Sequence, residues 1–379
     1  MEMLGTWLES GAMACFYIFA FVLVLSFVVL VHEGGHFLVA RWCGVKVEEF
    51  SLGFGHELCG WNDKKGTRWK ICLFPLGGYV KMLGDQDAAG AQSTTKNLPP
   101  KLRKYAFMSQ KLWKRAAIIF AGPATNYIFA VFIFWMVLFF TGVSVLPAII
   151  DEVEDNSAAQ EVGMLPGDRI VDVNGHEIKS FTDVQRAIRM TEFGKELTVQ
   201  FERGGEIHTV QMTPRYMDKD SDHPRIGVRV IPRMHYQAME PTKIGLVEAF
   251  QRSVSQVWVM TRDTLSYLGQ VLFNGRPPKE MRGPLGIAEA SGDAFEGGFY
   301  SLLIFIGSIS VAVGLMNLLP IPLLDGGHLA LYLLEAIRRK PLTEKVQNAV
   351  MWMGFSILIG LVGYTFFLDI PRIIKRIFE

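Results

Sequence analysis

Five consecutive residues, His32-Glu33-Gly34-Gly35-His36, combine side chains that bind metal with one that can move a proton. On a helix, His32 and His36 are one turn apart and project from the same face, so both imidazoles can reach one ion. Glu33 lies beside them, where a carboxylate can hold a water and take its proton. This is the spacing that a zinc hydrolase requires. The motif therefore predicts Zn²⁺ as cofactor, with His32 and His36 as ligands and Glu33 as the catalytic base.

The segment around this motif is apolar enough to lie in a membrane. No charged residue occurs from Gly11 to Val31, and an apolar run resumes after His36 until Arg41. About 20 apolar residues suffice to cross a bilayer. A charged side chain near the bilayer centre costs at least about 2.5–3.5 kcal/mol on insertion scales, so this polar cluster requires compensation. A buried histidine with an ordinary hydrogen-bond partner does not explain the adjacent carboxylate, whereas a bound metal does.

A second polar cluster at membrane depth predicts the third ligand. The stretch from Asn317 to His328 contains two prolines, two residues apart, which cannot continue a regular helix. A broken helix inside a membrane is tolerated only where it lines a cavity or packs on protein. Asp325 follows the break, and zinc would supply the counter-charge that its carboxylate needs. Two alternatives stand beside this interpretation: Asp325 caps the helix that restarts at Gly326, or His328 competes with it as ligand.

Four apolar stretches predict four transmembrane helices and so place both termini on one side. Basic residues cluster between the first two spans and again after the third, so both of these connections should be cytoplasmic. The termini and the segment from about Gly142 to Phe299 then lie outside. The first span should be retained, because its flank carries Glu2 and Glu9 but no lysine or arginine. The predicted spans are Gly11–Ala40, Ala116–Thr141, Tyr300–Leu319 and Ala349–Leu368.

The composition of the chain points to lipid and protein partners. Half of its 379 residues are hydrophobic (50%), and the formal net charge is +1. A nearly neutral chain offers no basic surface for nucleic acid, so no nucleic-acid partner is expected. The cysteines form no Cys-x-x-Cys pair, which argues against a thiolate zinc site.

The pairing of His-Glu-x-x-His with Asn-x-x-Pro-x-Pro-x-x-Asp-Gly resembles the site-2 protease family of intramembrane zinc metalloproteases, and within it the bacterial regulator of sigma-E protease branch. That resemblance implies that Glu33 activates water and that Asn317 binds substrate or stabilises the oxyanion. It also implies a membrane re-entrant β-hairpin loop. The glycine at position 34 departs from the family, whose members often have a larger residue there. The supporting segments are Phe50–Gly55 and Phe74–Met82 in the hairpin loop, Gly122–Asn126 in the second span and Gly283–Ile287 before the third.

The external segment has the pattern of a small folded domain. From about Pro147 to Pro232, strand-like runs alternate with glycine-rich turns, and Ser180 to Met190 is typical of a short amphipathic helix. Gly163 to Gly175 resembles the PDZ domains of bacterial periplasmic proteases, in a single copy. A PDZ groove binds an extended peptide at a sheet edge, so a peptide ligand is expected. The alternative is a folded spacer that binds nothing. Met239 to Gly275 predicts an amphipathic helix on the outer leaflet.

Together these patterns predict a polytopic α-helical membrane protein with four transmembrane helices, a membrane re-entrant β-hairpin loop and one extracytoplasmic PDZ (α+β) domain. The predicted function is that of a zinc endopeptidase of the bacterial inner membrane. Its substrates would be the transmembrane segments of single-span proteins, such as anti-sigma factors or signal-peptide remnants, in regulated intramembrane proteolysis. The alternatives are a non-catalytic membrane PDZ scaffold and a transporter. The predicted parts are 1–141 with the zinc motif and hairpin loop, 142–235 as the PDZ domain, 236–299 as a helical linker, and 300–379 with the last two spans.

Overall fold

The fold of the chain is that of a computed structural model. The chain forms two compact units, which are described separately below. The first unit joins Met1–Phe134 to Arg282–Glu379, and the second is Trp135–Met281. The structure describes residues 2–378, with the exception of 85–97, 144–145, 192–193, 217–223, 232–240, 276–277, 279–281 and 341–342.

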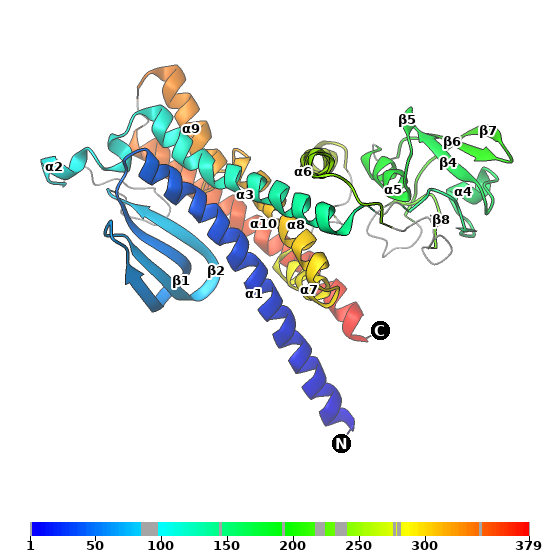
Figure 1. The fold of residues 1–379 in the computed structure, drawn as a ribbon, viewed down its shortest axis with the longest axis horizontal. Coiled ribbons are helices and arrows are strands. Elements are labelled where there is room, and N and C mark those ends of the chain that lie inside the picture. Colours follow the sequence, from blue (N-terminus) through cyan, green and yellow to red (C-terminus); the bar gives the residue numbers. More distant parts are fainter. Residues whose placement is uncertain are drawn as a thin grey trace. The chain divides into compact units, whose positions relative to one another are not determined.

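The first unit is built on long helices that lie side by side (Figure 1). Helix α1 packs against α7 and α8, and α10 contacts α7. The long helices are α1 (Glu2–Trp42), α3 (Leu112–Thr141), α8 (Phe299–Leu318) and α10 (Glu344–Phe378). The shorter ones are α2 (Pro100–Arg103), η2 (Phe107–Ser109), α7 (Pro284–Glu296) and α9 (Asp325–Arg338).

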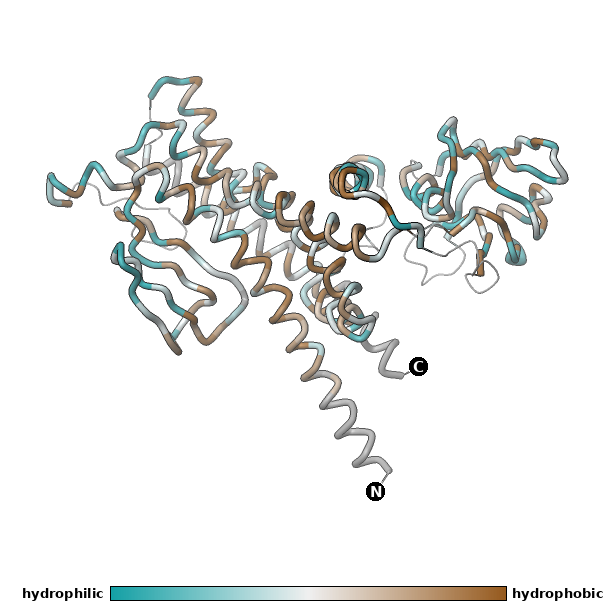
Figure 2. The backbone as a smooth tube through the Cα atoms, in the orientation of Figure 1, coloured by the Kyte–Doolittle hydropathy of each residue, from teal (hydrophilic) through white to brown (hydrophobic). Residues whose placement is uncertain are grey.

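Three of these helices are long and apolar enough to cross a membrane, judged by length and composition among the described residues. They are Cys15–Trp42 within α1, all of α3 and all of α8. Figure 2 shows hydrophobic residues along most of α3 and α8. These helices coincide with the first three predicted spans. The fourth predicted span, Ala349–Leu368, lies within α10, and its membrane crossing remains a prediction.

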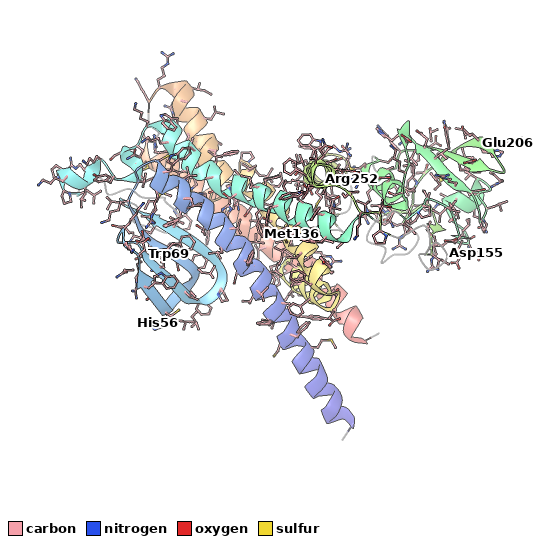
Figure 3. The ribbon with its side chains drawn as sticks, viewed as in Figure 1. His56, Trp69, Met136, Asp155, Glu206 and Arg252 are labelled. Atoms are coloured by element: carbon pink, nitrogen blue, oxygen red, sulfur yellow. The ribbon has the colours of Figure 1, made fainter. Side chains whose placement is uncertain are left out.

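A β-hairpin follows α1, as predicted for this region. Strand β1 (Val47–Asn62) pairs antiparallel with β2 (Arg68–Met82), and both strands fold back, so that Leu52 pairs with both Gly78 and Ile71. The doubled sheet therefore has the Phe74–Met82 part of β2 at one edge. Its inner face packs on α1 through edge-to-face contacts of Phe37 with Phe50 and with Trp69, which Figure 3 labels, and these two rings stack on each other. The entry of this hairpin into a membrane remains a prediction.

The predicted helix break after Asn317 is present. Helix α8 ends at Leu318, and α9 begins at Asp325. Between them Leu323 has a φ of 80°, a left-handed conformation that is costly for a residue with a side chain. The first turn of α9 packs directly on the broken segment: an added Cβ at Gly326 would overlap the Leu319 carbonyl oxygen. The two glycines after Asp325 thus allow the aspartate to sit close to the end of α8.

A buried aspartate explains the motif that precedes the third span. Asp369 of α10 accepts hydrogen bonds from the backbone N–H of Gly283 (3.1 Å) and of Gly286 (3.0 Å), at the start of α7. A Cβ at Gly283 would lie 2.6 Å from the Asp369 carboxylate. The glycines therefore let the carboxylate reach the unsatisfied N–H groups of the helix.

The second unit contains a four-stranded sheet in the order β5-β4-β6-β7 and a separate pair, β3-β8. A single apolar cluster fills the space between the sheet and the helices, with Val184, Leu197 and Val199 fully buried. The elements are β3 (Glu152–Val153), α4 (Ala158–Glu161), β4 (Arg169–Val173), β5 (His176–Glu177), α5 (Phe181–Met190), β6 (Leu197–Arg203), β7 (Glu206–Met212), β8 (Val228–Arg229) and α6 (Leu246–Phe273).

The predicted local elements of this unit are found at their predicted places. Helix α5 begins with a capping box between Ser180 and Asp183. Helix α6 covers most of the amphipathic segment and packs on α5, where Arg186 pairs with Asp263 at 3.2 Å. A turn after Gly163 is closed by Asp168, whose carboxylate accepts from the Leu165 N–H.

Candidate metal centre

Three potential metal ligands meet between α1 and the start of α9. His32, His36 and Asp325 each offer one donor atom, and these atoms all lie within 4.8 Å of one another. The Asp325 Oδ2 atom is 3.1 Å from His32 Nε2 and 3.4 Å from His36 Nε2. The two Nε2 atoms are 3.3 Å apart. The structure thus brings the three predicted ligands together, although they come from distant parts of the sequence.

The donor set fits a zinc ion. Two imidazole nitrogens and one carboxylate oxygen form a common ligand set of catalytic zinc sites, which leave a fourth position for water or substrate. Asp325 Oδ2 is buried without a hydrogen-bond partner among the described residues. An unpaired buried carboxylate oxygen is costly, and a cation at this point would satisfy it.

The structure rejects one of the two alternatives for Asp325. The residue that precedes the first turn of α9 is Leu324, and no side chain caps this helix end by a hydrogen bond. Asp325 is instead the first residue of α9 and directs its carboxylate at the imidazoles. His328 is not part of the group of donor atoms that lie within 4.8 Å of one another. The geometry therefore favours Asp325 as the third ligand.

Both imidazoles are buried against α3. His32 is 8% exposed and His36 is 7% exposed. A Cβ at Gly122 of α3 would overlap His36 Nε2 and lie 2.9 Å from His32 Cε1. Glycine at this position therefore lets α3 approach the ligands more closely than any other residue would. The sequence motif Gly122–Asn126 was recognised by resemblance, but the contact of its glycine with the ligands was not foreseen.

The two glycines within the zinc motif have different surroundings. A Cβ at Gly35 would overlap Thr125 Oγ1 and lie 2.5 Å from the Ala121 carbonyl oxygen. Gly35 thus permits the close approach of another backbone that two adjacent glycines suggest. At Gly34 an added Cβ meets nothing within 4 Å. The family difference at this position therefore changes the space beside the site and not the packing of the ligands.

Strand β2 passes beside the predicted catalytic base. A Cβ at Gly78 would lie 3.1 Å from Glu33 Cγ and 2.9 Å from Val29 Cγ1. The edge of the folded hairpin therefore runs along α1 at the level of Glu33. Asn317, the other predicted catalytic residue, lies in the last turn of α8, where it is partly buried. Among the described residues, no hydrogen bond joins Asn317 to the ligand cluster.

Asn126 is a residue of the site to which the sequence assigned no role. It is fully buried in α3, and its amide nitrogen lies 3.2 Å from Nδ1 of His32. On the same face, the Ile118 carbonyl accepts a hydrogen bond of 2.8 Å from Nδ1 of His36. Positions 118, 122 and 126 are spaced by one helical turn each, so one face of α3 supports both imidazoles.

Metal donors and a carboxylate gathered on apolar helices are the arrangement expected of a membrane-embedded metallohydrolase. The chain belongs to Peptidase family M50, because the model of that family matches residues 20–361. It is 37% identical to a protein of Agrobacterium fabrum named as a zinc metalloprotease, over 94% of this chain and 96% of that one. It is 32% identical to the metalloprotease MmpA of Caulobacter vibrioides, over 92% of this chain and 94% of that one. The protein is therefore a zinc metalloprotease of the site-2 type.

Solved structures of PDZ domains match part of the chain. The PDZ domain of an SdrC-like protein from Listeria monocytogenes is 22% identical, over 24% of this chain and 96% of that chain, with a TM-score of 0.22. At this TM-score the likeness does not establish the fold. The PDZ assignment therefore stays a prediction.

Proposed function

We propose that the protein is an intramembrane endopeptidase that cleaves the transmembrane segments of single-span membrane proteins. The observation that carries this proposal is the position of the donor atoms of His32, His36 and Asp325, which meet on helices apolar enough to span a membrane. Zinc ligands at membrane depth would serve the cleavage of a substrate that is itself in the membrane. They would not be needed there for a soluble substrate. A catalytically silent scaffold would gain nothing from Glu33, because a structural zinc site has no use for a free carboxylate.

The residues of the site divide the chemistry among them. His32, His36 and Asp325 would hold the zinc ion, which when bound supplies Lewis acidity to the scissile carbonyl and to the attacking water. Glu33 takes a proton from that water and later passes it to the leaving amine. Asn317 orients the peptide or donates a hydrogen bond to the developing oxyanion.

The hairpin offers a way to hold an unwound substrate. A transmembrane helix hides its peptide bonds, so it must be extended locally before it can be cut. The Phe74–Met82 part of β2 is an edge of the doubled sheet and runs beside Glu33 at Gly78. An extended segment added to this edge would lie along the site by ordinary strand pairing. We therefore assign substrate presentation to this edge.

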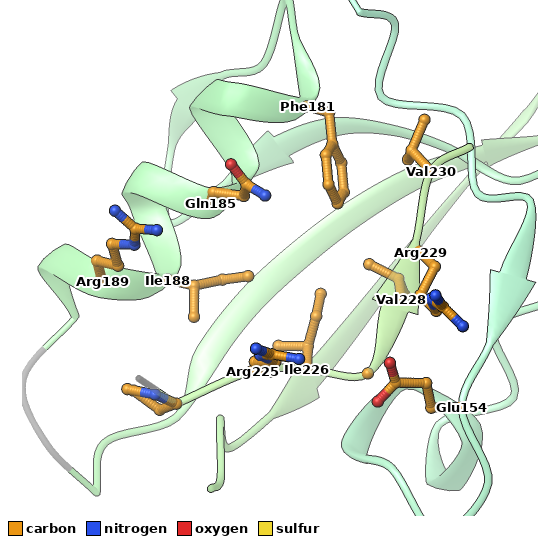
Figure 4. A pocket seen from close by; sticks show the side chains of 12 residues that line it. Glu154, Phe181, Gln185, Ile188, Arg189, Arg225, Ile226, Val228, Arg229 and Val230 are labelled. Carbon is orange, nitrogen blue, oxygen red and sulfur yellow. The ribbon is translucent and has the colours of Figure 1, made fainter. Parts of the chain in front are cut away.

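The second unit offers a groove for an extended peptide. A cavity of about 370 Å³ lies between α5 and the segment that includes β8 (Figure 4). Apolar side chains line it, with arginines at 189, 225 and 229 around them. In the described sheet β8 pairs with β3 alone, which leaves its other edge facing the cavity. This arrangement suits peptide binding by strand addition, and the predicted role is to screen substrates by their external parts.

Helix α6 suits the membrane surface. Its start is tied to the end of α3: Trp135 Nε1 donates to the Leu246 carbonyl (3.0 Å), and Val143 pairs with Thr242. Lipid is therefore the expected partner of the apolar stripe along α6. With α10 as a fourth span, both termini and the second unit would lie outside the bacterial inner membrane. The exposed stripe consists of Leu246, Val247, Phe250, Val254, Trp258, Leu265 and Leu272.

The test is to measure zinc content and proteolysis on the purified protein in proteoliposomes, with a single transmembrane peptide as substrate. The parent should hold about one zinc per chain and cut the peptide within its apolar segment. Glu33→Gln should keep the zinc. Its kcat should fall by about 10²- to 10⁴-fold or more, which is what a general base contributes. Glu206→Gln, which alters an exposed carboxylate at the start of β7, serves as the matched control and should cut normally. Cleavage by Glu33→Gln at the parental rate would reject Glu33 as the base, and absence of both zinc and cleavage in the parent would favour the scaffold.

A further inference from the structure

A small cavity lies where α1 ends and the β-hairpin turns back. Its volume is about 160 Å³, and two buried valines, Val45 and Val47, contribute to its lining. The charged side chains that line it are Arg41 at the end of α1, Lys46 just before β1 and Lys65 in the turn between β1 and β2. The described residues that line it include no acidic one. The cavity therefore combines an apolar part with three cations.

The aspartate that pairs with Arg41 is fully occupied by the protein itself. Asp63 Oδ1 accepts from the backbone N–H groups of Lys65 (2.8 Å) and Thr67 (3.0 Å). Its Oδ2 atom accepts from the Arg41 guanidinium and from Nε1 of Trp69 (3.3 Å). Thr67 Oγ1 accepts a further hydrogen bond of 2.8 Å from Arg41. These bonds tie the hairpin turn to the end of α1 and hold Arg41 in place, so Asp63 has no free capacity for another cation.

The two lysines of the cavity have no counter-charge. Among the described residues, no ion pair or hydrogen bond involves the ammonium group of Lys46 or of Lys65, and both residues are exposed. The carbonyl groups at the end of α1 do not replace an anion, because loop N–H groups occupy them: Val45 N–H donates to the Ala40 carbonyl at 2.9 Å. Like charges that line one small cavity repel each other, and an anion between them removes this repulsion.

Two exposed tryptophans indicate that this end of the helices lies at a membrane surface. Trp42 ends α1 and is 87% exposed, and Trp113 in the first turn of α3 is 63% exposed. Lys114 Nζ donates to the Cys43 carbonyl (2.9 Å), so the start of α3 lies beside the end of α1. Tryptophan is enriched where membrane helices meet the lipid headgroups. With α1 across the membrane, the cavity that begins at Arg41 lies at the depth of the lipid phosphates.

We propose that this cavity binds the phosphate of an anionic phospholipid, with Lys46 and Lys65 as its cationic contacts and Arg41 as a fixed donor. A phosphate diester has one negative charge and several acceptor oxygens, which suit these groups. Basic pockets at the ends of membrane helices bind anionic headgroups in this way. The cavity is too small for a whole lipid, so the acyl chains lie outside it, in the membrane. A bound headgroup would connect the start of the hairpin to its turn.

The experiment titrates the purified full-length protein in a neutral detergent with short-chain phosphatidylglycerol and counts bound lipid by native mass spectrometry. Phosphatidylcholine, which has the same phosphate but no net charge, and inorganic phosphate are the comparison ligands. The parent should bind phosphatidylglycerol more tightly than phosphatidylcholine. Inorganic phosphate at equal concentration should not displace the lipid, because it has no acyl chains to bury. Neither zinc content nor proteolysis enters this measurement, so its outcome is independent of the proposed enzyme activity.

Lys46→Gln and Lys65→Gln, alone and combined, test the cationic contacts. A basic residue contributes about 5-fold to the affinity for anionic lipid, the equivalent of about 1 kcal/mol, so each variant should bind about 5-fold more weakly and the combined variant about 25-fold. Lys64→Gln removes the same charge from an exposed position in the same turn that does not line the cavity, and it should bind as the parent does. Thermal unfolding without lipid should be the same in all variants.

The proposal is overturned if the combined variant binds phosphatidylglycerol as tightly as the parent. It is also overturned if Lys64→Gln loses as much affinity as Lys65→Gln, because the effect would then be one of general charge and not of the cavity. Equal affinity for phosphatidylcholine would contradict the selection of an anionic lipid. Displacement of the lipid by an equal concentration of inorganic phosphate would identify a site for soluble phosphate instead.

Discussion

Asp168 in the second unit is a buried aspartate and Asp325 in the first has a buried Oδ2 atom, but their oxygens meet different partners. Asp168 accepts two hydrogen bonds of 2.7 Å from Arg203 and a third from the Leu165 N–H. Asp325 directs its buried Oδ2 at two imidazole nitrogens and has no hydrogen bond to that atom among the described residues. The first carboxylate is satisfied by the protein alone. A bound cation would satisfy the second, so the partners of a buried carboxylate oxygen distinguish a structural aspartate from a candidate metal ligand.

The same contrast holds within the first unit. Asp369 is fully buried in α10, yet its two oxygens accept from the backbone N–H groups of Gly283 and Gly286. Depth in the protein is therefore not what marks Asp325. What distinguishes Asp325 is that the polar groups facing its Oδ2 atom are two imidazole nitrogens, and imidazoles commonly bind metals.

Replacing Asp325 and Asp168 in turn should give the largest difference between the two aspartates. Asp325→Ala should lower zinc affinity by more than about 100-fold, beyond the about 10- to 100-fold expected for a supporting residue, and should abolish cleavage. Asp168→Asn should leave zinc content unchanged. Metal analysis after dialysis distinguishes the two. If Asp325→Ala retains zinc and His328→Ala loses it, then His328 is the third ligand.

Removal of the sheet domain of the second unit should test whether catalysis and substrate recognition reside in different parts of the protein. Val143 and Thr242 pair through their backbones, so the chain enters and leaves this region side by side, and excision of residues 147–232 can be bridged by a short linker. The shortened enzyme should hold zinc and cut a short transmembrane peptide. It should also cut a substrate with a folded external domain that the full chain refuses.

The comparison to make is one transmembrane segment with and without a folded external domain, each offered to full-length and shortened enzyme. A stable, zinc-loaded shortened enzyme that refuses the bulky substrate as strongly as the full chain would mean that the groove does not screen substrates. The domain would then be a spacer.

The two glycines of the zinc motif offer a matched pair within one helix. Gly35→Ala would place a Cβ onto Thr125 Oγ1 and within 2.5 Å of the Ala121 carbonyl oxygen, which forces α1 and α3 apart. We expect a loss of about 1–3 kcal/mol in stability and reduced zinc affinity. Gly34→Ala meets open space and should gain up to about 1 kcal/mol from helix propensity. Thermal unfolding of both variants in detergent checks this order, and equal losses would contradict it.

The Asp168–Arg203 pair predicts how the stability of the second unit depends on pH. Burial opposes ionisation of Asp168, but the hydrogen bonds from Arg203 and Leu165 outweigh it and lower the pKa of the carboxyl group. A pKa lowered by folding stabilises the fold above the ordinary aspartate pKa of about 3.9, and this contribution is lost as the pH falls below it. Asp168→Asn should therefore cost about 1–3 kcal/mol at pH 7 and progressively less below about pH 4.

Hydrogen exchange of the β6 and β7 amides in the full-length protein measures this difference. Exchange in Asp168→Asn should be faster than in the parent at neutral pH, and the two should converge in acid after correction for intrinsic rates. A gap that stays constant with pH would show that the pair does not contribute through its charge.

The metal site could be predicted from the sequence because it depends on residue spacing within a helix and on the cost of placing charge in a membrane. The spacing of His32 and His36 fixes their common helix face, and a carboxylate at membrane depth needs a counter-charge, which selected Asp325. The structure brings these three side chains together as predicted. It corrects the alternative in which Asp325 caps a helix, because α9 begins at Asp325 itself.

Other features depend on contacts between distant segments and could not be read from the pattern. The fold-back of the hairpin, which pairs Leu52 with both Gly78 and Ile71, leaves no periodic signature. The role of Asn126 depends on its distance from His32, and that distance is set by Gly122 and by the packing of α3 on α1. The β-hairpin itself was predicted through resemblance to a family and not from its residues.

The metal ligands also lie far apart in the order of synthesis. His32 and His36 belong to the first helix, whereas Asp325 follows the break that ends α8. At synthesis rates of about 5–20 residues per second, the gap between them takes about 15–60 s to translate. Throughout that interval the nascent chain lacks the third predicted ligand, so the predicted zinc site cannot be complete before Asp325 has been translated.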